Sequence, residues 1–202
     1  MAGVVIATDP DASELRPGDE VFGFAKSAFA EYACSAQLIR KPSSLTFEQA
    51  AAVPVAGLTA LQALTNHGSL QAGQDVIING ASGGVGTFAV QIAKYLGAHV
   101  TSVCSSGNIQ LVRSLGSDQV LDYTQTDLTK AAGRYDLMVD CIGNHTLVAC
   151  RRILKPQGRY VMVGAPSGRW VAPLERGLRA SMLSMFASQI FLFSWRDGIQ
   201  AI

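Results

Sequence analysis

A glycine-rich turn lies near the middle of the chain, and it reads Asn79-Gly80-Ala81-Ser82-Gly83-Gly84-Val85-Gly86. The apolar run Asp75–Asn79 ends in this turn, and the residues that follow, Gly84–Leu96, have the apolar spacing of a helix. Gly83 lets the backbone approach a pyrophosphate, and Gly86 lets the helix pack close to the strand. The helix N-terminus adds free N–H groups and a partial positive charge. A strand, this turn and a helix in that order predict a Rossmann-type nucleotide-binding site.

Two residues of the turn leave other interpretations open. Ala81 stands where the motif has its first glycine, which is tolerable if that residue keeps an ordinary φ. Ser82 lies in a G-x-S-x-G pattern, which in hydrolases exposes a nucleophilic serine. The helical spacing after the turn favours phosphate binding instead, with Ser82 as a hydroxyl donor to the pyrophosphate. A glycine turn that serves only to pack a strand against a helix is the remaining alternative.

Strands and helices alternate from this turn almost to the end of the chain. We expect strands at Asp75–Asn79, His99–Cys104, Gln119–Asp122, Tyr135–Cys141 and Gly158–Gly164, and helices at Gly84–Leu96, Asn108–Leu115 and Leu147–Leu154. Helical spacing also runs through residues 46–64, on both sides of Pro54. Apolar strands joined by crossover helices indicate a parallel sheet that is covered on both faces. The expected fold class is therefore α/β, with a doubly wound parallel sheet.

A small β region precedes the α/β part. Short strands are expected at Gly3–Ala7, Asp19–Phe24 and Phe29–Cys34, with a turn at Pro17-Gly18 before the second strand. Tyr32, an aromatic residue of the third strand, is expected in the core. Three short strands make a marginal sheet, so we interpret this region as part of a β domain. The expected domains are residues 1–45 and 46–202.

Composition narrows the class of protein. The 202 residues are 49% hydrophobic and 15% charged, with a net charge of +1, which suits a globular protein and disfavours nucleic acid or a membrane as partner. No apolar run reaches the roughly 18 residues of a membrane span. The four cysteines form no C-x-x-C pair, so we expect buried thiols in a reduced compartment, the cytoplasm. Residues 182–195 form a serine-interrupted apolar stretch, interpreted as core or subunit interface.

The end of the second strand bears on the choice of cofactor. NAD-binding domains place an acidic residue about 20 residues beyond the glycine turn, where it holds the ribose 2′-hydroxyl. Residues 104–108 contain no carboxylate, and Ser105, Ser106 and Asn108 can donate hydrogen bonds to a 2′-phosphate. NADP(H) is therefore expected over NAD(H). On the neighbouring helices, Lys94 and Arg113 are expected on solvated faces.

A metal site is not expected. Tetrahedral zinc needs closely placed cysteine, histidine and carboxylate ligands. His67, His99 and His145 are far apart in the sequence, and Cys34 stands alone. We therefore assign no residue as a metal ligand.

Several blocks of sequence follow one another in one order, and this order identifies a protein family more specifically than any single block does. They are Pro17–Gly23, Phe29–Tyr32, Ala51–Ala60, the glycine turn, Leu111–Gly116, Val120–Tyr123, Asp136–Asp140 and Gly158–Gly164. With these blocks the chain resembles the zinc-independent quinone oxidoreductase branch of the medium-chain dehydrogenase/reductase superfamily.

The resemblance implies a GroES-like catalytic domain, represented in part by residues 1–45, followed by a Rossmann cofactor domain. It implies hydride transfer from NADPH to a small-molecule quinone or α,β-unsaturated carbonyl, without zinc. It places Thr59 and Val163-Gly164-Ala165 near the nicotinamide, and Tyr123 near the 2′-phosphate. The expected cofactor-binding residues are Thr59, Ala81, Ser82, Gly83, Gly84, Val85, Gly86, Ser105, Ser106, Asn108, Tyr123, Val163, Gly164 and Ala165. No catalytic residue is assigned; Tyr32 is a candidate proton donor in the partial domain, but an aromatic residue in a strand is more often part of the core.

The resemblance covers only part of the catalytic domain, and this leaves a second class of function open. The alternative is an inactive or truncated NADP(H)-binding module that serves as an interaction or regulatory subunit. Members of the family commonly dimerise through an edge strand, so a homodimer is expected, with residues 182–195 at the interface.

Overall fold

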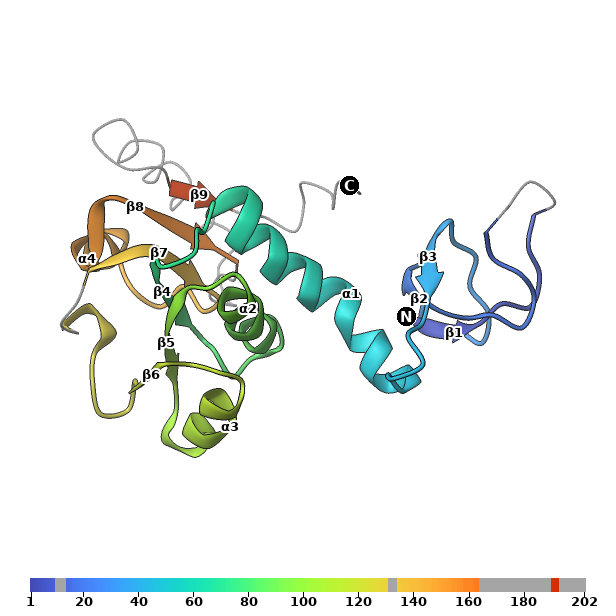
Figure 1. Ribbon diagram of the computed structural model, residues 1–202, viewed down its shortest axis with the longest axis horizontal. Helices are drawn as coiled ribbons and strands as arrows, with labels where there is room; N and C mark the ends of the chain where they lie inside the picture. The colour runs from blue at the N-terminus through green and yellow to red at the C-terminus, as the bar shows by residue number, and fades with distance from the viewer. Residues whose placement is uncertain (10–13, 131–133, 164–189, 193–202) are drawn as a thin grey trace. The chain divides into compact units, whose positions relative to one another are not determined.

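The structure is a computed structural model that describes residues 1–9, 14–130 and 134–163, together with the backbone of residues 190–192. The chain divides into two compact units, Met1–Leu58 and Thr59–Ile202. A three-stranded sheet lies in the first unit and a six-stranded sheet in the second (Figure 1).

The large sheet is parallel throughout. Its strands are β4 (Asp75–Asn79), β5 (His99–Cys104), β6 (Gln119–Asp122), β7 (Tyr135–Asp140), β8 (Leu154–Met162) and β9 (Ile190–Leu192). Their order in space is β6-β5-β4-β7-β8-β9, which is the strand order of dinucleotide-binding sheets. The order reverses between β4 and β7, and such sheets bind ligands at the carboxyl ends of these strands. The predicted doubly wound parallel sheet is confirmed.

Helices connect most of the strands of this sheet. Their bounds are α1 (Phe47–Gln62), α2 (Gly84–Tyr95), α3 (Ile109–Ser114) and α4 (Leu147–Ile153), with short helical turns η1 (Ala63–His67), η2 (Ser106–Asn108) and η3 (Leu128–Lys130). α1 continues through Pro54, which has no N–H and so omits one hydrogen bond of the helix. In Figure 1, α2 lies beside β4 and β5, and α4 lies beside β8.

Two apolar clusters form on opposite faces of the large sheet, because successive side chains of a strand point to opposite sides. Val76 and Ile78 of β4 belong to one cluster, and Ile77 belongs to the other. The first cluster includes the buried face of α2, and the second includes Ile153 of α4. Burial on both faces explains why the central strands are apolar along their whole length.

The small sheet is antiparallel, and one of its predicted strands is wrong. Its strands are β1 (Ala2–Val4), β2 (Glu20–Phe24) and β3 (Gln37–Arg40). β2 is central, and its two edges pair with β1 and β3, so neither edge is left for the predicted strand Phe29–Cys34. Tyr32, expected in the core, is 66% exposed.

The cysteines differ from expectation at one position. Cys104 and Cys150 are buried and Cys141 is half-buried, but Cys34 is exposed, and it lies outside the strands of the small sheet. All four are free thiols, and the reduced cytoplasmic compartment stays a prediction. Across the described ranges, no helix has the length and apolar character needed to cross a bilayer.

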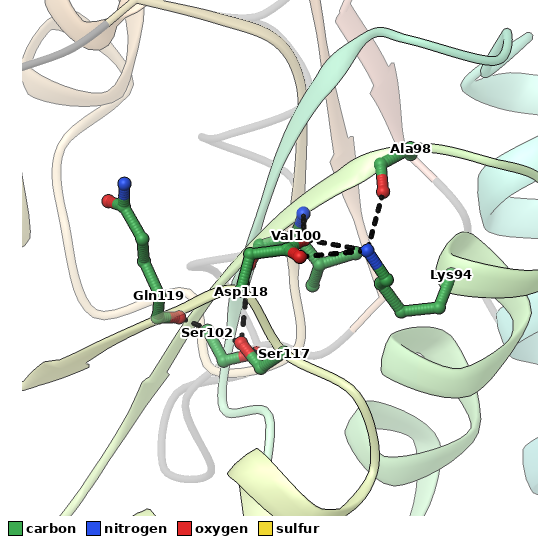
Figure 2. A network of polar contacts seen from close by, with 7 residues as sticks. All are labelled: Lys94, Ala98, Val100, Ser102, Ser117, Asp118 and Gln119. Carbon is green, nitrogen blue, oxygen red and sulfur yellow. Dashed lines mark hydrogen bonds and ion pairs between the residues drawn. The ribbon is translucent and has the colours of Figure 1, made fainter.

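A polar network ties α2 to the amino ends of β5 and β6, as Figure 2 shows. Lys94 Nζ donates to both carboxylate oxygens of Asp118 at 2.9 Å and to the Ala98 carbonyl at 3.3 Å. Asp118 Oδ2 also accepts the Val100 N–H at 2.7 Å. Ser117, next to Asp118, donates its hydroxyl to the Gln119 carbonyl at 2.7 Å.

Lys94 keeps 32% of its side chain exposed within this ion pair, and Arg113 is exposed as expected. Burial alone would raise the pKa of Asp118. The hydrogen bonds from Lys94 and from the Val100 N–H outweigh burial and hold that pKa below its usual value. Asp118 is thus an ionised carboxylate that stabilises the amino edge of the sheet at neutral pH.

Replacing Asp118 by Asn should lower the free energy of unfolding at pH 7 by about 0.5–1 kcal/mol, since the ion pair is partly exposed and screened by water. A carboxylate with a lowered folded-state pKa stabilises the fold above its unfolded pKa, near 4, and this stabilisation is lost as the pH falls through the folded value. The difference between D118N and the unchanged protein should therefore shrink below about pH 4. Urea denaturation at pH 7 and pH 3 measures both quantities.

A Lys94→Met variant provides the control for this prediction. If the two side chains stabilise the fold through their ion pair, the double variant K94M/D118N should lose little more than either single variant. Additive losses would contradict the pairing.

Candidate cofactor-binding site

The glycine turn joins the carboxyl end of β4 to the N-terminus of α2. Gly80 has a left-handed backbone with φ of +84°, which residues with a side chain rarely adopt. Ala81 has an ordinary φ, so the residue in place of the first motif glycine is not strained. The N–H groups of Gly80 and Ala81 donate to the Val103 carbonyl at 3.2 and 3.0 Å. The turn is therefore held against β5.

Gly86 brings the first turn of α2 into contact with the glycine turn. A Cβ atom at position 86 would lie 2.1 Å from the Gly80 carbonyl oxygen, which is closer than such atoms can approach. At position 84, in contrast, a Cβ atom would meet nothing within 4 Å. The approach of the helix to the turn thus requires glycine at position 86 and permits a side chain at position 84.

The N-terminus of α2 has unused hydrogen-bond donors. The Thr87 N–H donates to the carbonyl of the N-cap residue Gly83 at 2.9 Å, and Gly83 has no side chain to cap the helix. Within the part of the chain that the structure describes, the N–H groups of Gly84, Val85 and Gly86 have no acceptor. Free N–H groups at the positive end of a 12-residue helix fit a pyrophosphate.

A buried carboxylate lies beside this turn, at the end of β7. Asp140 is fully buried, and its Oδ1 accepts hydrogen bonds from Asn79 Nδ2 at 2.9 Å and from the N–H groups of Gly143 at 2.7 Å and Ile142 at 3.1 Å. Its Oδ2 accepts the Tyr160 hydroxyl at 2.7 Å. Four donors compensate for the removal of this carboxylate from water.

This network fixes the turn after β7 against the glycine turn. Asn79 Nδ2 also donates to Asn144 Oδ1 at 3.0 Å. The two turns touch, because a Cβ atom on Gly80 would lie 2.8 Å from Cγ1 of Ile142. Sequence reasoning did not assign Asp140 to the site. The available signal was a charged residue that ends an apolar strand, where burial without partners is costly.

The cysteines near these turns are protonated thiols. Burial, and to a smaller extent the negative charge of Asp140, raises the pKa of Cys141 to about 12. Burial also raises the pKa of Cys104, with a further contribution from Asp122. Neither thiol is a nucleophile at neutral pH. In the described ranges, no three His, Cys, Asp or Glu residues come together in a way that could hold a metal ion.

The loop after β5 contains no carboxylate of its own, but the fold supplies one. β5 and β6 are paired in parallel, so the last residue of β6, Asp122, lies next to this loop. Ser106 Oγ donates to Asp122 Oδ2 at 2.5 Å, and Asn108 Nδ2 donates to Ser105 Oγ at 3.1 Å. Two of the three predicted donors are thus already hydrogen-bonded within the protein.

Two further predicted residues lie at the same edge of the sheet. Tyr123 follows β6 with its ring exposed, and its N–H donates to the Cys104 carbonyl at 3.1 Å. Val163 follows β8, and its N–H donates to the Asp140 carbonyl at 2.8 Å. Both positions are consistent with the predicted contacts to a dinucleotide.

The other predicted residues lie in the glycine turn, in α1 or outside the described residues. Ser82 is half-buried within the glycine turn, and Thr59 is buried in α1 with 3% exposure. Gly164 and Ala165 lie outside the described residues. The structure thus brings together the predicted residues of the glycine turn, of the loops after β5 and β6, and of the end of β8.

The strand order, the glycine turn and the open helix N-terminus define a dinucleotide-binding domain of the Rossmann class. Residues 84–196, more than half of the chain, match the family model of the zinc-binding dehydrogenases. A trans-enoyl reductase (pgmF) of Aspergillus terreus is 39% identical over 182 residues, which cover 82% of this chain and 51% of that protein. The mitochondrial NAD(P)H oxidoreductase RTN4IP1 of Mus musculus is 38% identical over 168 residues, with coverages of 77% and 42%.

A solved structure agrees with these relatives. The quinone oxidoreductase from Coxiella burnetii has a TM-score of 0.82 and 30% identity, and the match covers 98% of this chain and 62% of that one. The chain therefore belongs to the zinc-binding dehydrogenase family, in the quinone oxidoreductase-like branch of the medium-chain dehydrogenase/reductase superfamily. It spans about half the length of the curated relatives that it matches.

Replacing Gly86 by Ala should weaken the binding of a nicotinamide dinucleotide at least tenfold and lower the free energy of unfolding by about 1–3 kcal/mol, because the added Cβ forces α2 away from the turn. Gly84→Ala is the matched control for stability, because its Cβ meets no protein atom within 4 Å, and it should change the free energy of unfolding by less than about 0.5 kcal/mol. Fluorescence titration and thermal unfolding measure the two effects. Equal losses of stability in both variants would contradict the close-contact role of Gly86.

Proposed function

We propose that this chain carries the cofactor-binding part of an NADPH-dependent oxidoreductase that transfers hydride, without zinc, to a quinone or an α,β-unsaturated carbonyl. The observation that carries the proposal is the start of α2, where three N–H groups are free at a turn that Gly86 holds close. Relatives named quinone oxidoreductase, NAD(P)H oxidoreductase and trans-enoyl reductase support the substrate classes and the cofactor.

The residues of the chain bind and orient the reactants. A nicotinamide cofactor supplies the hydride when bound. The N–H groups of Gly84, Val85 and Gly86 hold the pyrophosphate, and the Asp140 network keeps the turn after β7 in place beside it. Thr59 and the stretch 163–165 are proposed to lie beside the nicotinamide, from the resemblance to the family. No described side chain is assigned to proton transfer.

The proposed preference for NADP(H) over NAD(H) rests on the loop after β5. This loop has no carboxylate of its own. Ser105 accepts a hydrogen bond from Asn108 and retains its own hydroxyl proton, which can be donated to a 2′-phosphate. Tyr123 is exposed at the end of the neighbouring strand, and its proposed contact with the 2′-phosphate rests on the resemblance to the family.

Titration of the purified chain with NADPH, followed by nicotinamide fluorescence, tests the cofactor site. We expect saturable binding in the micromolar range, and a rate of NADPH oxidation that rises on addition of a naphthoquinone or an enal. Absence of binding at millimolar NADPH would overturn the proposal. Binding without any oxidation would favour the alternative function, a cofactor-binding module that acts as an interaction or regulatory subunit.

We also propose that the chain forms a homodimer. β9 is the last strand in the order of the described sheet and pairs with β8. An edge strand of this kind can pair with the same strand of a second copy. The apolar side chains of residues 182–195, expected at the interface, lie outside the described residues. Sedimentation velocity at micromolar concentration should give a species of twice 21.3 kDa, and a stable monomer would contradict the dimer.

A further inference from the structure

Asp122 and Ser106 join the loops that follow two neighbouring strands at the carboxyl edge of the large sheet. Ser106 Oγ lies 2.5 Å from Asp122 Oδ2 and 3.1 Å from Thr124 Oγ1. Asp122 Oδ1 accepts both the N–H and the hydroxyl of Thr124, at 2.9 and 2.8 Å. These contacts hold the carboxylate in one position beside the loop where a Rossmann sheet binds the adenosine ribose.

The direction of the hydrogen bond from Ser106 determines what this serine offers to a ligand. The hydrogen bonds from Ser106 and Thr124 keep the pKa of Asp122 below its usual value, so the carboxylate is ionised at neutral pH and can only accept. Ser106 therefore gives its single proton to Asp122 and presents lone pairs to a ligand. Lone pairs suit a ribose 2′-hydroxyl, which can donate, and they repel the oxygens of a 2′-phosphate.

The negative charge of Asp122 also disfavours a 2′-phosphate relative to a 2′-hydroxyl. A 2′-phosphate within hydrogen-bonding distance of Ser106 would lie within about 5 Å of the Asp122 carboxylate. The phosphate carries about −1.5 to −2 charges at neutral pH, so the two groups repel each other. The Ser106 and Asp122 contacts are exposed, and salt screens such a repulsion. A 2′-hydroxyl is uncharged and experiences no such repulsion.

We propose that Asp122, together with Ser106, is a specificity determinant that lowers the affinity of this site for NADPH relative to NADH. The inference rests on the proposed function, because a dinucleotide must bind at this edge of the sheet. Ser105 and Asp122 then have opposite effects, since one favours a 2′-phosphate and the other a 2′-hydroxyl. The chain consequently binds both cofactors, and its affinity for NADPH exceeds that for NADH by only a small factor.

The test compares dissociation constants for NADPH and NADH in the full 202-residue chain, measured by nicotinamide fluorescence. Asp122→Asn removes the charge and keeps the size of the side chain. D122N should increase the affinity for NADPH relative to NADH about tenfold at low salt, and the increase should fall to threefold or less in about 0.5 M salt. Because the readout is a ratio within one variant, a general loss of folded protein does not change it.

Asp127→Asn is the matched control. Asp127 Oδ1 accepts the N–H and the hydroxyl of Thr129 at 2.9 and 2.7 Å, which repeats the arrangement of Asp122 with Thr124, but its partners lie in η3. D127N should leave the ratio within about twofold. Ser106→Ala keeps the charge of Asp122, so its ratio should rise less than that of D122N.

Each result decides between the proposals. If both cofactors bind but D122N leaves the ratio unchanged, the inference about Asp122 is wrong and the proposed function stands. An equal rise in D127N would show an effect of net charge and would also overturn the inference. If neither cofactor binds to the unchanged protein, the proposed function and the inference fail together.

Discussion

The buried carboxylate of Asp140 is the interaction on which the ligand-binding edge of the large sheet depends. It lies where the order of the strands reverses, and its donors come from β4, from the turn after β7 and from β8. A buried carboxylate that loses a partner costs several kcal/mol, so these donors are strongly held in place. Asn79, the residue before the glycine turn, is thereby fixed relative to the turn after β7. The same network therefore ties the two turns to each other.

These contacts hold the free N–H groups of α2 in position for an anionic ligand. Donors that already point in one direction bind an anion without a further loss of conformational entropy. The contact between Gly86 and the Gly80 carbonyl sets the position of the helix, and the hydrogen bonds to the Val103 carbonyl set the position of the turn. Three separate constraints therefore act on the glycine turn. They are the buried charge of Asp140, the absence of a side chain at Gly86 and the backbone carbonyl of Val103.

The sequence predicted those parts of the structure that local patterns determine. Apolar spacing placed β4 correctly, and placed α2 to within one residue of its end, because burial on one face repeats along each element. It failed at Phe29–Cys34, where the pattern is that of a strand but β2 has no unpaired edge. It also missed two hydrogen bonds, from Asn79 to Asp140 across 61 residues and from Ser106 to Asp122 across 16. Contacts between residues distant in sequence leave no local pattern.

Ion pairs gather at the opposite, amino edge of the large sheet. Lys155 pairs with Asp75 at 3.0 Å and with Asp136 at 2.7 Å, and Lys94 pairs with Asp118 just before β6 begins. A strand such as β4, with five residues, separates the two edges by about 15 Å. Substitutions in these pairs can therefore alter heat resistance while the choice of ligand stays the same. A lineage of such proteins can adapt to a new temperature and to a new cofactor supply by independent steps.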